Sequence, residues 1–251
     1  MNRLTRLLGK KVGRAPASPI ASANDLQAYY LQGFLQAPLA AGARRERLLA
    51  ALRRLHADEM KAGFSWETKY PHTRDLRPNA GDYDDALLDI LFDSDVPGLL
   101  ARATGLRLQL AHVQLRAVFP GASYMDWHRD THMYGGRLSG SVPPMQKVIF
   151  YPSLGGPSQP KLAVAPGSHR RVMATEAADL RQVKQSEVVT IDSSDERCLL
   201  FDTSLLHAAI PETDPRGSLR VIYAFGHDFQ LGAFAGSEHV QERYRARVIS
   251  R

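Results

Sequence analysis

The chain has 251 residues, of which 44% are apolar and 23% are charged, a composition typical of a globular protein and not of a fibrous or wholly disordered one. Its 32 basic and 26 acidic residues give a net charge of +6. No apolar run approaches the roughly 18 residues of a membrane-spanning helix, so we expect no integral membrane association. The single cysteine, Cys198, excludes an intrachain disulfide framework and any site built from several thiolates, and it favours a reducing, cytoplasmic location.

Most of the excess positive charge lies at the N-terminus. Residues 1–14 include five basic residues and no acidic one, while the rest of the chain is close to neutral. We therefore expect residues 1–23 to form a flexible basic tail, although the acid-free, arginine-rich composition also resembles an organelle transit peptide. No nucleic-acid partner is expected, because the near-neutral remainder carries no dense basic stripe with interleaved aromatic residues.

The chain that follows the tail begins with helical patterns. Helices are predicted over residues 24–35 and, more strongly, over residues 43–62, where leucines recur at helical spacing. Arginines occupy the other faces of the second helix, and we interpret them as a solvated face rather than a nucleic-acid contact. Residues 63–81 contain glycine and proline at short intervals, which is typical of a loop. Shorter helices are predicted over residues 82–92 and 96–104.

From residue 105 the pattern changes to short β-type segments separated by turns that contain glycine and proline. The predicted strands are residues 106–119, 146–151, 161–165, 187–191, 197–201 and 219–225. Helices followed by many short strands predict a mainly β fold, with N-terminal helices packed on a sandwich or barrel. No linker demands a second domain, so residues 24–251 are expected to form one domain, with a helical part (24–104), a β core (105–226) and a C-terminal segment (227–251).

The most informative stretch contains His128 and Asp130. On a strand these two side chains point to the same face, where they can bind one divalent metal. A second histidine would complete the two-histidine, one-carboxylate set that leaves positions on iron(II) open. His207, just after a predicted strand, is the best candidate. Arg220, in the next predicted strand, offers the planar fork that binds a dicarboxylate cosubstrate through two parallel hydrogen bonds.

The pattern His128-X-Asp130, the turn Pro166-Gly-Ser-His-Arg170, His207 and Arg220 together resemble the phytanoyl-CoA dioxygenase-like family of Fe(II)/2-oxoglutarate-dependent oxygenases, over roughly residues 105–226. The resemblance implies a double-stranded β-helix (jelly-roll) core covered by helices. It also implies a catalytic iron(II) bound by His128, Asp130 and His207, with Arg220 on the distal carboxylate of 2-oxoglutarate. The implied activity uses O2 to hydroxylate, or otherwise oxidise, a C–H bond of a small organic substrate, with release of succinate and CO2.

Further residues are candidates for the 2-oxoglutarate site. Lys147 begins a predicted strand and is placed to reach the cosubstrate. Gln114 belongs to the polar face of its strand, and that face either turns toward the metal pocket or is exposed to solvent. Arg216 competes with Arg220, but we prefer Arg220 because it is inside a strand while Arg216 sits in a turn.

The presence of Asp130 bears on the type of oxidation, because related halogenases have a small residue in place of the metal-binding aspartate. Hydroxylation or another oxidation is therefore favoured over halogenation. Several arginines suggest an anionic small-molecule substrate, unless they are simply solvated: Arg129, Arg137, Arg170 and Arg171. The alternative function is a non-catalytic jelly-roll protein that binds a metal or a ligand, although such a protein would usually lack one metal ligand or the arginine.

Overall fold

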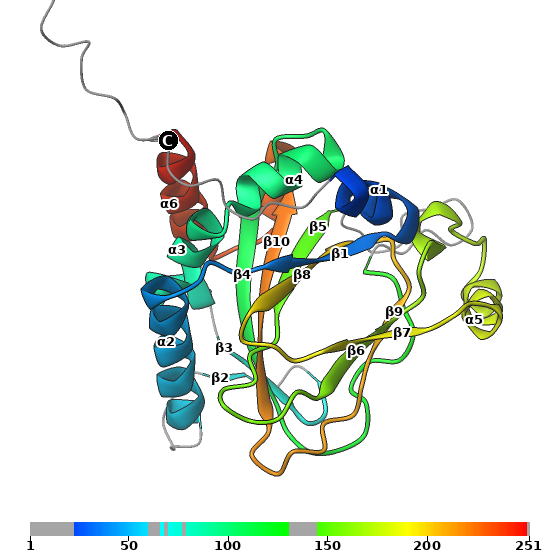
Figure 1. The fold of residues 1–251 in the computed structure, drawn as a ribbon, viewed down its shortest axis with the longest axis horizontal. Helices are drawn as coiled ribbons and strands as arrows, with labels where there is room; N and C mark the ends of the chain where they lie inside the picture. Colours follow the sequence, from blue (N-terminus) through cyan, green and yellow to red (C-terminus); the bar gives the residue numbers. More distant parts are fainter. Residues whose placement is uncertain (1–22, 60–65, 68–69, 77–78, 131–144, 250–251) are drawn as a thin grey trace, which may run out of the picture.

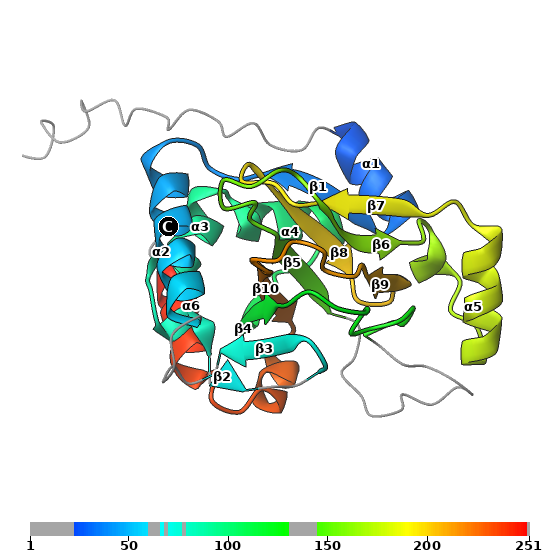
Figure 2. The ribbon, with the colours of Figure 1, turned by 90° about the horizontal axis from the view of Figure 1, so that it is seen from below.

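The computed structural model describes residues 23–59, 66–67, 70–76, 79–130 and 145–249. Residues 1–22 of the predicted tail and Arg137 lie outside these ranges. Two sheets make up the core, and helices lie against the larger one (Figures 1 and 2). Among the described residues, no helix combines the length and the apolar character that crossing a membrane requires.

The larger sheet contains seven strands within the described part of the chain, and each is antiparallel to its neighbours. Its order is β1 (Phe34–Pro38), β8 (Arg197–Asp202), β5 (Gln146–Phe150), β10 (Ser218–Gly226), β4 (Gln109–Val118), β3 (Thr73–Leu76) and β2 (Trp66–Glu67). The smaller sheet has the order β7 (Val189–Asp192), β6 (Pro160–Val164) and β9 (His207–Ala209), also antiparallel. The predicted mainly β fold with N-terminal helices is confirmed.

Alternation along the strands creates two apolar clusters, one on each face of the larger sheet. The cluster between the two sheets includes Phe34, Ile149, Leu162, Val164, Ile191, Phe201 and Ile222. The cluster on the outer face joins strand residues to helix residues and includes Leu48, Leu52, Leu87, Leu115, Val148, Val221 and Tyr223. The space between the sheets is therefore walled by apolar side chains, and a polar residue that points into it is conspicuous.

Among the described residues, five α-helices lie with the larger sheet and one lies apart from it. The first group comprises α1 (Ala23–Gln32), α2 (Ala43–Glu59), α3 (Ala86–Asp93), α4 (Val96–Thr104) and the C-terminal α6 (Glu238–Ile249). The remaining α-helix, α5 (Glu176–Gln185), lies at the opposite side of the molecule from α2 and α6, beyond the smaller sheet (Figures 1 and 2). Helical cover thus extends to both sides of the sandwich.

The structure corrects the predicted elements at the N-terminal side. The helix predicted over 24–35 ends at Gln32, because Gly33 adopts a left-handed conformation (φ 84°) that suits a helix C-terminus. Residues 34 and 35 instead begin β1, which pairs with β8, so strand pairing overrides the local helical pattern. The predicted loop 63–81 contains β2 and β3, and the helix predicted over 82–92 begins only at Ala86.

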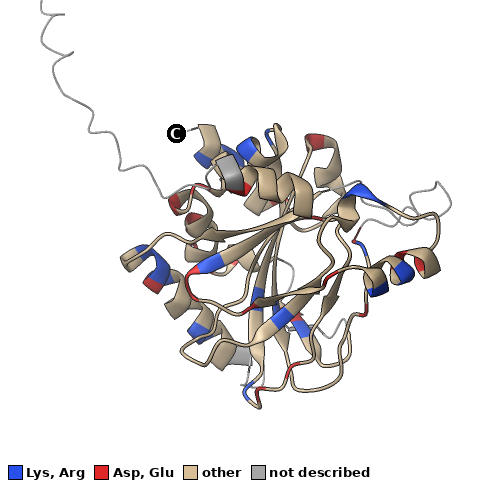
Figure 3. Ribbon diagram, turned by 45° about the vertical axis from the view of Figure 1, so that its right-hand side comes forward, with Lys and Arg blue, Asp and Glu red and all other residues tan. Residues whose placement is uncertain are grey.

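The arginine-rich face of α2 is ion-paired with α3 and with the residue Asp84 that precedes it. The pairs are Arg44 with Asp93, Arg47 with Asp89 and Arg54 with Asp84, and all three arginine side chains are exposed. Figure 3 shows basic residues spread over several helices and strands, with acidic residues among them. Exposed pairs of this kind contribute little to stability, about 0–1 kcal/mol each, so they mark a solvated surface.

Candidate metal centre

The structure brings His128, Asp130 and His207 together at one point between the two sheets. Each offers one ligand atom, and the three ligand atoms lie within 4.8 Å of one another. Nε2 of His207 is 3.5 Å from one carboxylate oxygen of Asp130, and Nε2 of His128 is 3.9 Å from the other. Two imidazoles and one carboxylate at this spacing form the donor set that suits a borderline divalent ion such as iron(II).

Backbone pairing fixes the relative position of the two histidines. His128 donates its N–H to the carbonyl of His207 at 2.9 Å, and His207 donates back to the carbonyl of His128 at 3.0 Å. The N–H of Asp130 donates to the carbonyl of Thr203 at 3.0 Å, so a second backbone hydrogen bond holds this segment against the chain before His207. Residues 128–130 were predicted to lie on a strand, and the structure has only this single bridge, yet the two side chains still share a face.

Each histidine ring is held by a backbone carbonyl. Nδ1 of His128 lies 2.7 Å from the carbonyl oxygen of Asp126, and Nδ1 of His207 lies 2.8 Å from that of Leu205. A carbonyl oxygen can only accept, so each Nδ1 must carry the ring proton and each Nε2 must present a lone pair. Among the described residues, Nε2 of His128 is buried without a hydrogen-bond partner. This orphaned acceptor beside a carboxylate is what a metal-binding imidazole requires.

The ionisation of the three groups favours metal binding near neutral pH. Burial lowers the pKa of His207 to about 3 against the opposing charge of Asp130, and burial also lowers the pKa of His128. Burial alone would raise the pKa of Asp130, but the adjacent Lys147 ammonium and the two histidines hold it well below its usual range. Both imidazoles are therefore neutral and the carboxylate is ionised at pH 7, which is the state that binds a metal.

Two basic side chains predicted for the cosubstrate line the same cavity as the three ligand residues. Lys147 Nζ forms an ion pair with Asp130 Oδ2 at 2.8 Å. Arg220 projects from β10 into the space between the sheets and is 8% exposed. The rest of the cavity wall is apolar and consists of Met125, Ile149, Leu162, Phe201, Ala209 and Ile222.

The guanidinium of Arg220 is charged and has hydrogen-bonding capacity to spare. Its carbon lies 5.0 Å from the centre of the Tyr124 ring, over the ring face. Burial opposes its charge, but Tyr124, Tyr151 and Asp75 raise the pKa of Arg220 above its ordinary value. Within the described part of the chain, its Nε has no hydrogen-bond partner. A buried, charged and incompletely paired arginine is suited to bind an anion.

Arg216, the competing arginine, lies elsewhere. It donates to Asp214 in the exposed turn before β10, with 3.0 and 2.7 Å separations from Nε and Nη2. It does not line the cavity that contains the three ligand residues. The arrangement of the two arginines thus agrees with the preference for Arg220 as the anion-binding residue.

Gln114 faces the interior of the sandwich but lies beside the cavity rather than in its wall. Its amide donates to Asp75 at 2.6 Å, and Arg116 forms an ion pair with both oxygens of the same carboxylate. Asp75 and Arg116 are 0% and 2% exposed, so the polar face of β4 is buried rather than solvated. The sequence reading missed Asp75, because residues 63–81 were interpreted as a loop, and only the alternation within β3 could have indicated that it points inward.

The substrate hint drawn from four arginines is partly wrong. Arg129 is fully buried, and its guanidinium binds Asp179 on α5, so it is neither solvated nor directed into the cavity. Arg170 and Arg171 are exposed near the turn that precedes α5. None of these three lines the cavity with the ligand residues.

Solved structures share this architecture. HygX from Streptomyces hygroscopicus, with nickel, 2-oxoglutarate and hygromycin B bound, is 15% identical, has a TM-score of 0.62 and covers 83% of this chain and 88% of its own. The non-heme alpha ketoglutarate dependent carbocyclase SnoK from nogalamycin biosynthesis is 14% identical, with a TM-score of 0.63 and coverage of 88% and 90%. EctD from S. alaskensis, with 2-oxoglutarate and 5-hydroxyectoine, is 17% identical, with a TM-score of 0.61 and coverage of 86% and 79%.

No protein-family model matches the sequence, and no curated protein matches it significantly. At identities of 14–17%, likeness to solved structures speaks for the fold. The predicted jelly-roll core is confirmed on this basis, and so is the resemblance on which that prediction rested. The chain has the phytanoyl-CoA dioxygenase-like fold of the iron- and 2-oxoglutarate-dependent oxygenases.

Proposed function

We propose that this protein is an Fe(II)- and 2-oxoglutarate-dependent oxygenase that hydroxylates, or otherwise oxidises, a C–H bond of a small organic substrate. The observation that carries the proposal is the convergence of His128, Asp130 and His207 in a cavity that also holds Arg220. Each part alone is common, whereas a facial donor set next to a buried, charged arginine is the arrangement that binding an iron and a dicarboxylate together requires.

The residues present fit a divalent metal. His128 and His207 direct their unprotonated Nε2 atoms to the same side as the Asp130 carboxylate, and each ring is oriented by a carbonyl. Three protein ligands leave coordination positions open for a bidentate cosubstrate and O2. When bound there, iron(II) with 2-oxoglutarate supplies the oxidising chemistry, with succinate and CO2 as the other products.

The other polar residues that line the cavity, Lys147 and Arg220, are proposed to bind 2-oxoglutarate. Arg220 takes the distal carboxylate through its forked N–H groups and is supported from behind by Tyr124. Lys147 neutralises Asp130 at 2.8 Å and lines the same cavity, where its ammonium would contact a carboxylate of the cosubstrate. Gln114 lies beside the cavity rather than in its wall, and its amide donates to Asp75, the carboxylate that also pairs with Arg116.

The apolar wall of the cavity is proposed to hold the substrate and to exclude water. Met125, Leu162 and Ile222 border the ligand residues and exclude water from the space between the sheets. Exclusion of water protects a reactive centre from side reactions and keeps the target C–H bond close to it. The retained carboxylate of Asp130 supports oxidation over halogenation as the outcome.

The solved structures of the same fold support a small-molecule substrate. HygX has been determined with hygromycin B, and the epimerase SnoN with Fe3+, alpha ketoglutarate and nogalamycin RO. SnoK and SnoN are a carbocyclase and an epimerase, so the fold accommodates more than one oxidation outcome. For this chain we propose hydroxylation as the first outcome to test.

The test is an anaerobic titration followed by visible absorption. Wild-type protein with Fe(II) and 2-oxoglutarate is expected to develop a charge-transfer band, because the keto acid chelates the metal. Omitting either component should abolish the band, and so should His128→Ala, which removes one of the two imidazole ligands. A wild-type protein that binds Fe(II) but develops no band with excess 2-oxoglutarate would instead support the alternative of a metal- or ligand-binding jelly-roll protein without this activity.

A further inference from the structure

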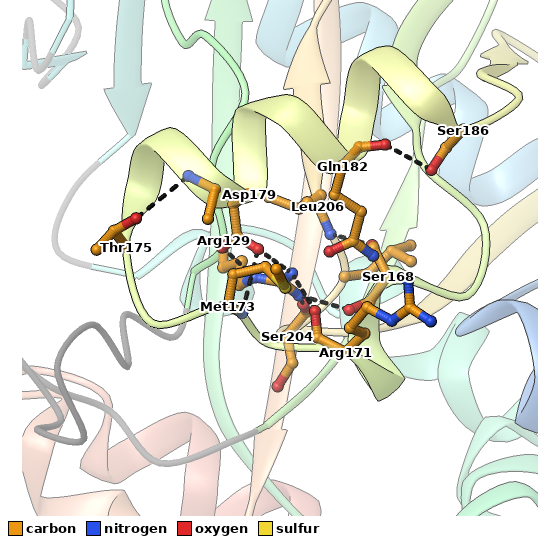
Figure 4. A network of polar contacts seen from close by, with 12 residues as sticks. Arg129, Ser168, Arg171, Met173, Thr175, Asp179, Gln182, Ser186, Ser204 and Leu206 are labelled. Atoms are coloured by element: carbon orange, nitrogen blue, oxygen red, sulfur yellow. Dashed lines mark hydrogen bonds and ion pairs between the residues drawn. The ribbon is translucent and has the colours of Figure 1, made fainter.

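A second buried polar cluster lies directly behind the three ligand residues. Arg129 stands between His128 and Asp130 in the chain, and alternation turns its side chain away from the cavity. It is fully buried, and it donates from Nε and Nη2 to the two carboxylate oxygens of Asp179 at 2.8 and 2.7 Å (Figure 4). Asp179 lies on α5 and is 1% exposed, so the pair is shielded from solvent on both sides.

The remaining N–H groups of Arg129 bind backbone carbonyls from two other segments. Nη1 donates to Ser168 at 2.9 Å and to Ser204, and Nη2 donates to Arg171 at 3.2 Å. Together with the two bonds to Asp179, these contacts use all five N–H groups of the guanidinium. One side chain therefore joins the segment of the first two metal ligands to α5, to the turn before α5 and to the chain just before His207.

Ser168 extends this connection to the third ligand. It is fully buried, and its hydroxyl accepts the N–H of Leu206 at 2.8 Å (Figure 4). The carbonyl of Leu206 accepts the N–H of Ala165 at 3.0 Å, so both polar backbone groups of the residue before His207 are held. The network thus contacts the chain on the far side of all three ligand residues without touching the ligand atoms.

The composition of the cluster suggests a role in geometry rather than in stability alone. A buried ion pair stabilises a fold poorly, since desolvation offsets most of the attraction, and well-packed apolar side chains of the same volume often do as well. A bidentate arginine–carboxylate pair, in contrast, fixes distance and orientation between the segments it joins. A small apolar cluster also joins α5 to the same segments, with Val183 packed against Ala165, Leu206 and Trp127.

We propose that Arg129 and Asp179 form a positioning pair that holds His128, Asp130 and His207 at metal-binding spacing; this inference rests on the proposed function. Neither residue touches the metal or the substrate. Loosening the pair leaves the backbone hydrogen bonds of His128 and Asp130 to hold the 128–130 segment against the chain around His207. The three donors then converge less well, and metal affinity falls.

The experiment titrates the Asp179→Asn and Arg129→Lys variants with Co(II) under anaerobic conditions. The visible d–d absorption of Co(II) reports binding. Asp179→Asn keeps the shape and removes the charge, while Arg129→Lys keeps the charge and removes the fork. We expect the dissociation constant for Co(II) to rise about tenfold or more in each variant, as for other outer partners of metal ligands. The double variant Arg129→Lys with Asp179→Asn should raise the Co(II) dissociation constant by far less than the product of the two single effects.

A matched control separates positioning from general destabilisation. Lys161 and Glu212 form another buried ion pair, at 2.7 Å, and neither lines the cavity of the ligand residues. Lys161→Met should lower the unfolding temperature comparably and leave the Co(II) dissociation constant unchanged. If an Arg129 or Asp179 variant fails to fold, Ser168→Ala replaces it, and a severalfold weaker affinity is then expected.

The outcomes are distinguishable. Wild-type affinity and an unchanged d–d spectrum in Asp179→Asn, or in Ser168→Ala where it is used, would overturn the positioning role and leave the proposed function intact. An equal loss of affinity in Lys161→Met would also overturn it, because any destabilisation would then suffice. A wild-type protein that binds no Co(II) would contradict the proposed function itself.

Discussion

His128 and His207 exchange two backbone hydrogen bonds, of 2.9 and 3.0 Å, although they are far apart in the sequence. Their ring centroids are 4.3 Å apart as a result, and the rings stand on the same side of the bridge. The backbone bridge therefore brings the two imidazoles side by side. Asp130, two residues along the same extended segment, completes the set.

Removing a ligand side chain should abolish metal-dependent turnover. His128→Ala and Asp130→Ala are each expected to lose iron-dependent oxidation and to raise the Ni(II) dissociation constant by more than about a hundredfold, which exceeds the usual effect of an outer partner. Calorimetric titration with Ni(II) measures the binding. Folding should survive, since His128 and Asp130 are only partly buried, and a variant with unimpaired activity would refute the assignment.

Substitution of Arg220 should weaken 2-oxoglutarate binding, and substitution of Arg216 should not. Arg220→Gln removes a buried, charged donor from the cavity and should weaken 2-oxoglutarate binding about 100-fold, the magnitude expected for lost charge-assisted hydrogen bonds. Arg216→Gln removes only an exposed pair with Asp214 and serves as the matched control. Titration of the Fe(II) complex with 2-oxoglutarate gives both constants. Equal effects, or a larger one at Arg216, would exclude Arg220 as the anion-binding residue.

The stability of the metal-free protein should fall on mild acidification. Burial lowers the pKa of His207 from 6.5 to about 3, so between these values the unfolded chain binds a proton that the folded chain does not. The free energy of unfolding therefore rises with pH in this window, and His207 should account for a loss of about 2 kcal/mol from pH 7.5 to pH 5. Urea denaturation at pH 7.5 and at pH 5, with a chelator present, measures this difference in the free energy of unfolding.

The control for this effect is His207→Gln, which removes the titrating group. Its unfolding free energy should change less between pH 7.5 and pH 5 than that of the wild type, by about the same 2 kcal/mol. Identical pH profiles for the two proteins would show that His207 does not carry the shift.

Cys198 should be chemically inert in the folded protein. It is 3% exposed, and burial raises its pKa to about 12, so almost no thiolate is present at pH 8. Alkylation by iodoacetamide, followed by mass spectrometry, should be complete in denaturant and negligible under native conditions. Rapid native labelling would contradict the position of Cys198 in the core of β8.

The sequence predicted the parts of the site that follow from local periodicity. His128 and Asp130 share a face because they are two residues apart, and Arg220 lies within β10, inside a strand as its sequence pattern predicted. Choosing His207 as the third ligand needed only the expectation that a later strand must supply it. Each of these residues lies in or beside a segment whose β pattern is clear.

What the sequence could not reveal depends on contacts between distant segments. Asp75 was missed because β3 is a short strand in a stretch rich in turn residues, and its partner Arg116 comes from β4. Arg129 was interpreted as a contact to an anionic substrate or as a solvated residue, because its partner Asp179 on α5 is distant in the sequence. Residues 34 and 35 follow a helical pattern locally, but pairing with β8 determines their structure.

The most direct test of the proposed oxygenase is a single-turnover reaction. Wild-type protein loaded anaerobically with Fe(II) and 2-oxoglutarate is exposed to O2, and succinate is quantified against bound iron over time, with Asp130→Ala as the control. The proposed function predicts succinate stoichiometric with iron in the wild type and none above background in the variant. A charge-transfer band that persists in O2, with no succinate beyond the Asp130→Ala level, would contradict it and identify a protein that binds the cosubstrate without oxidising anything.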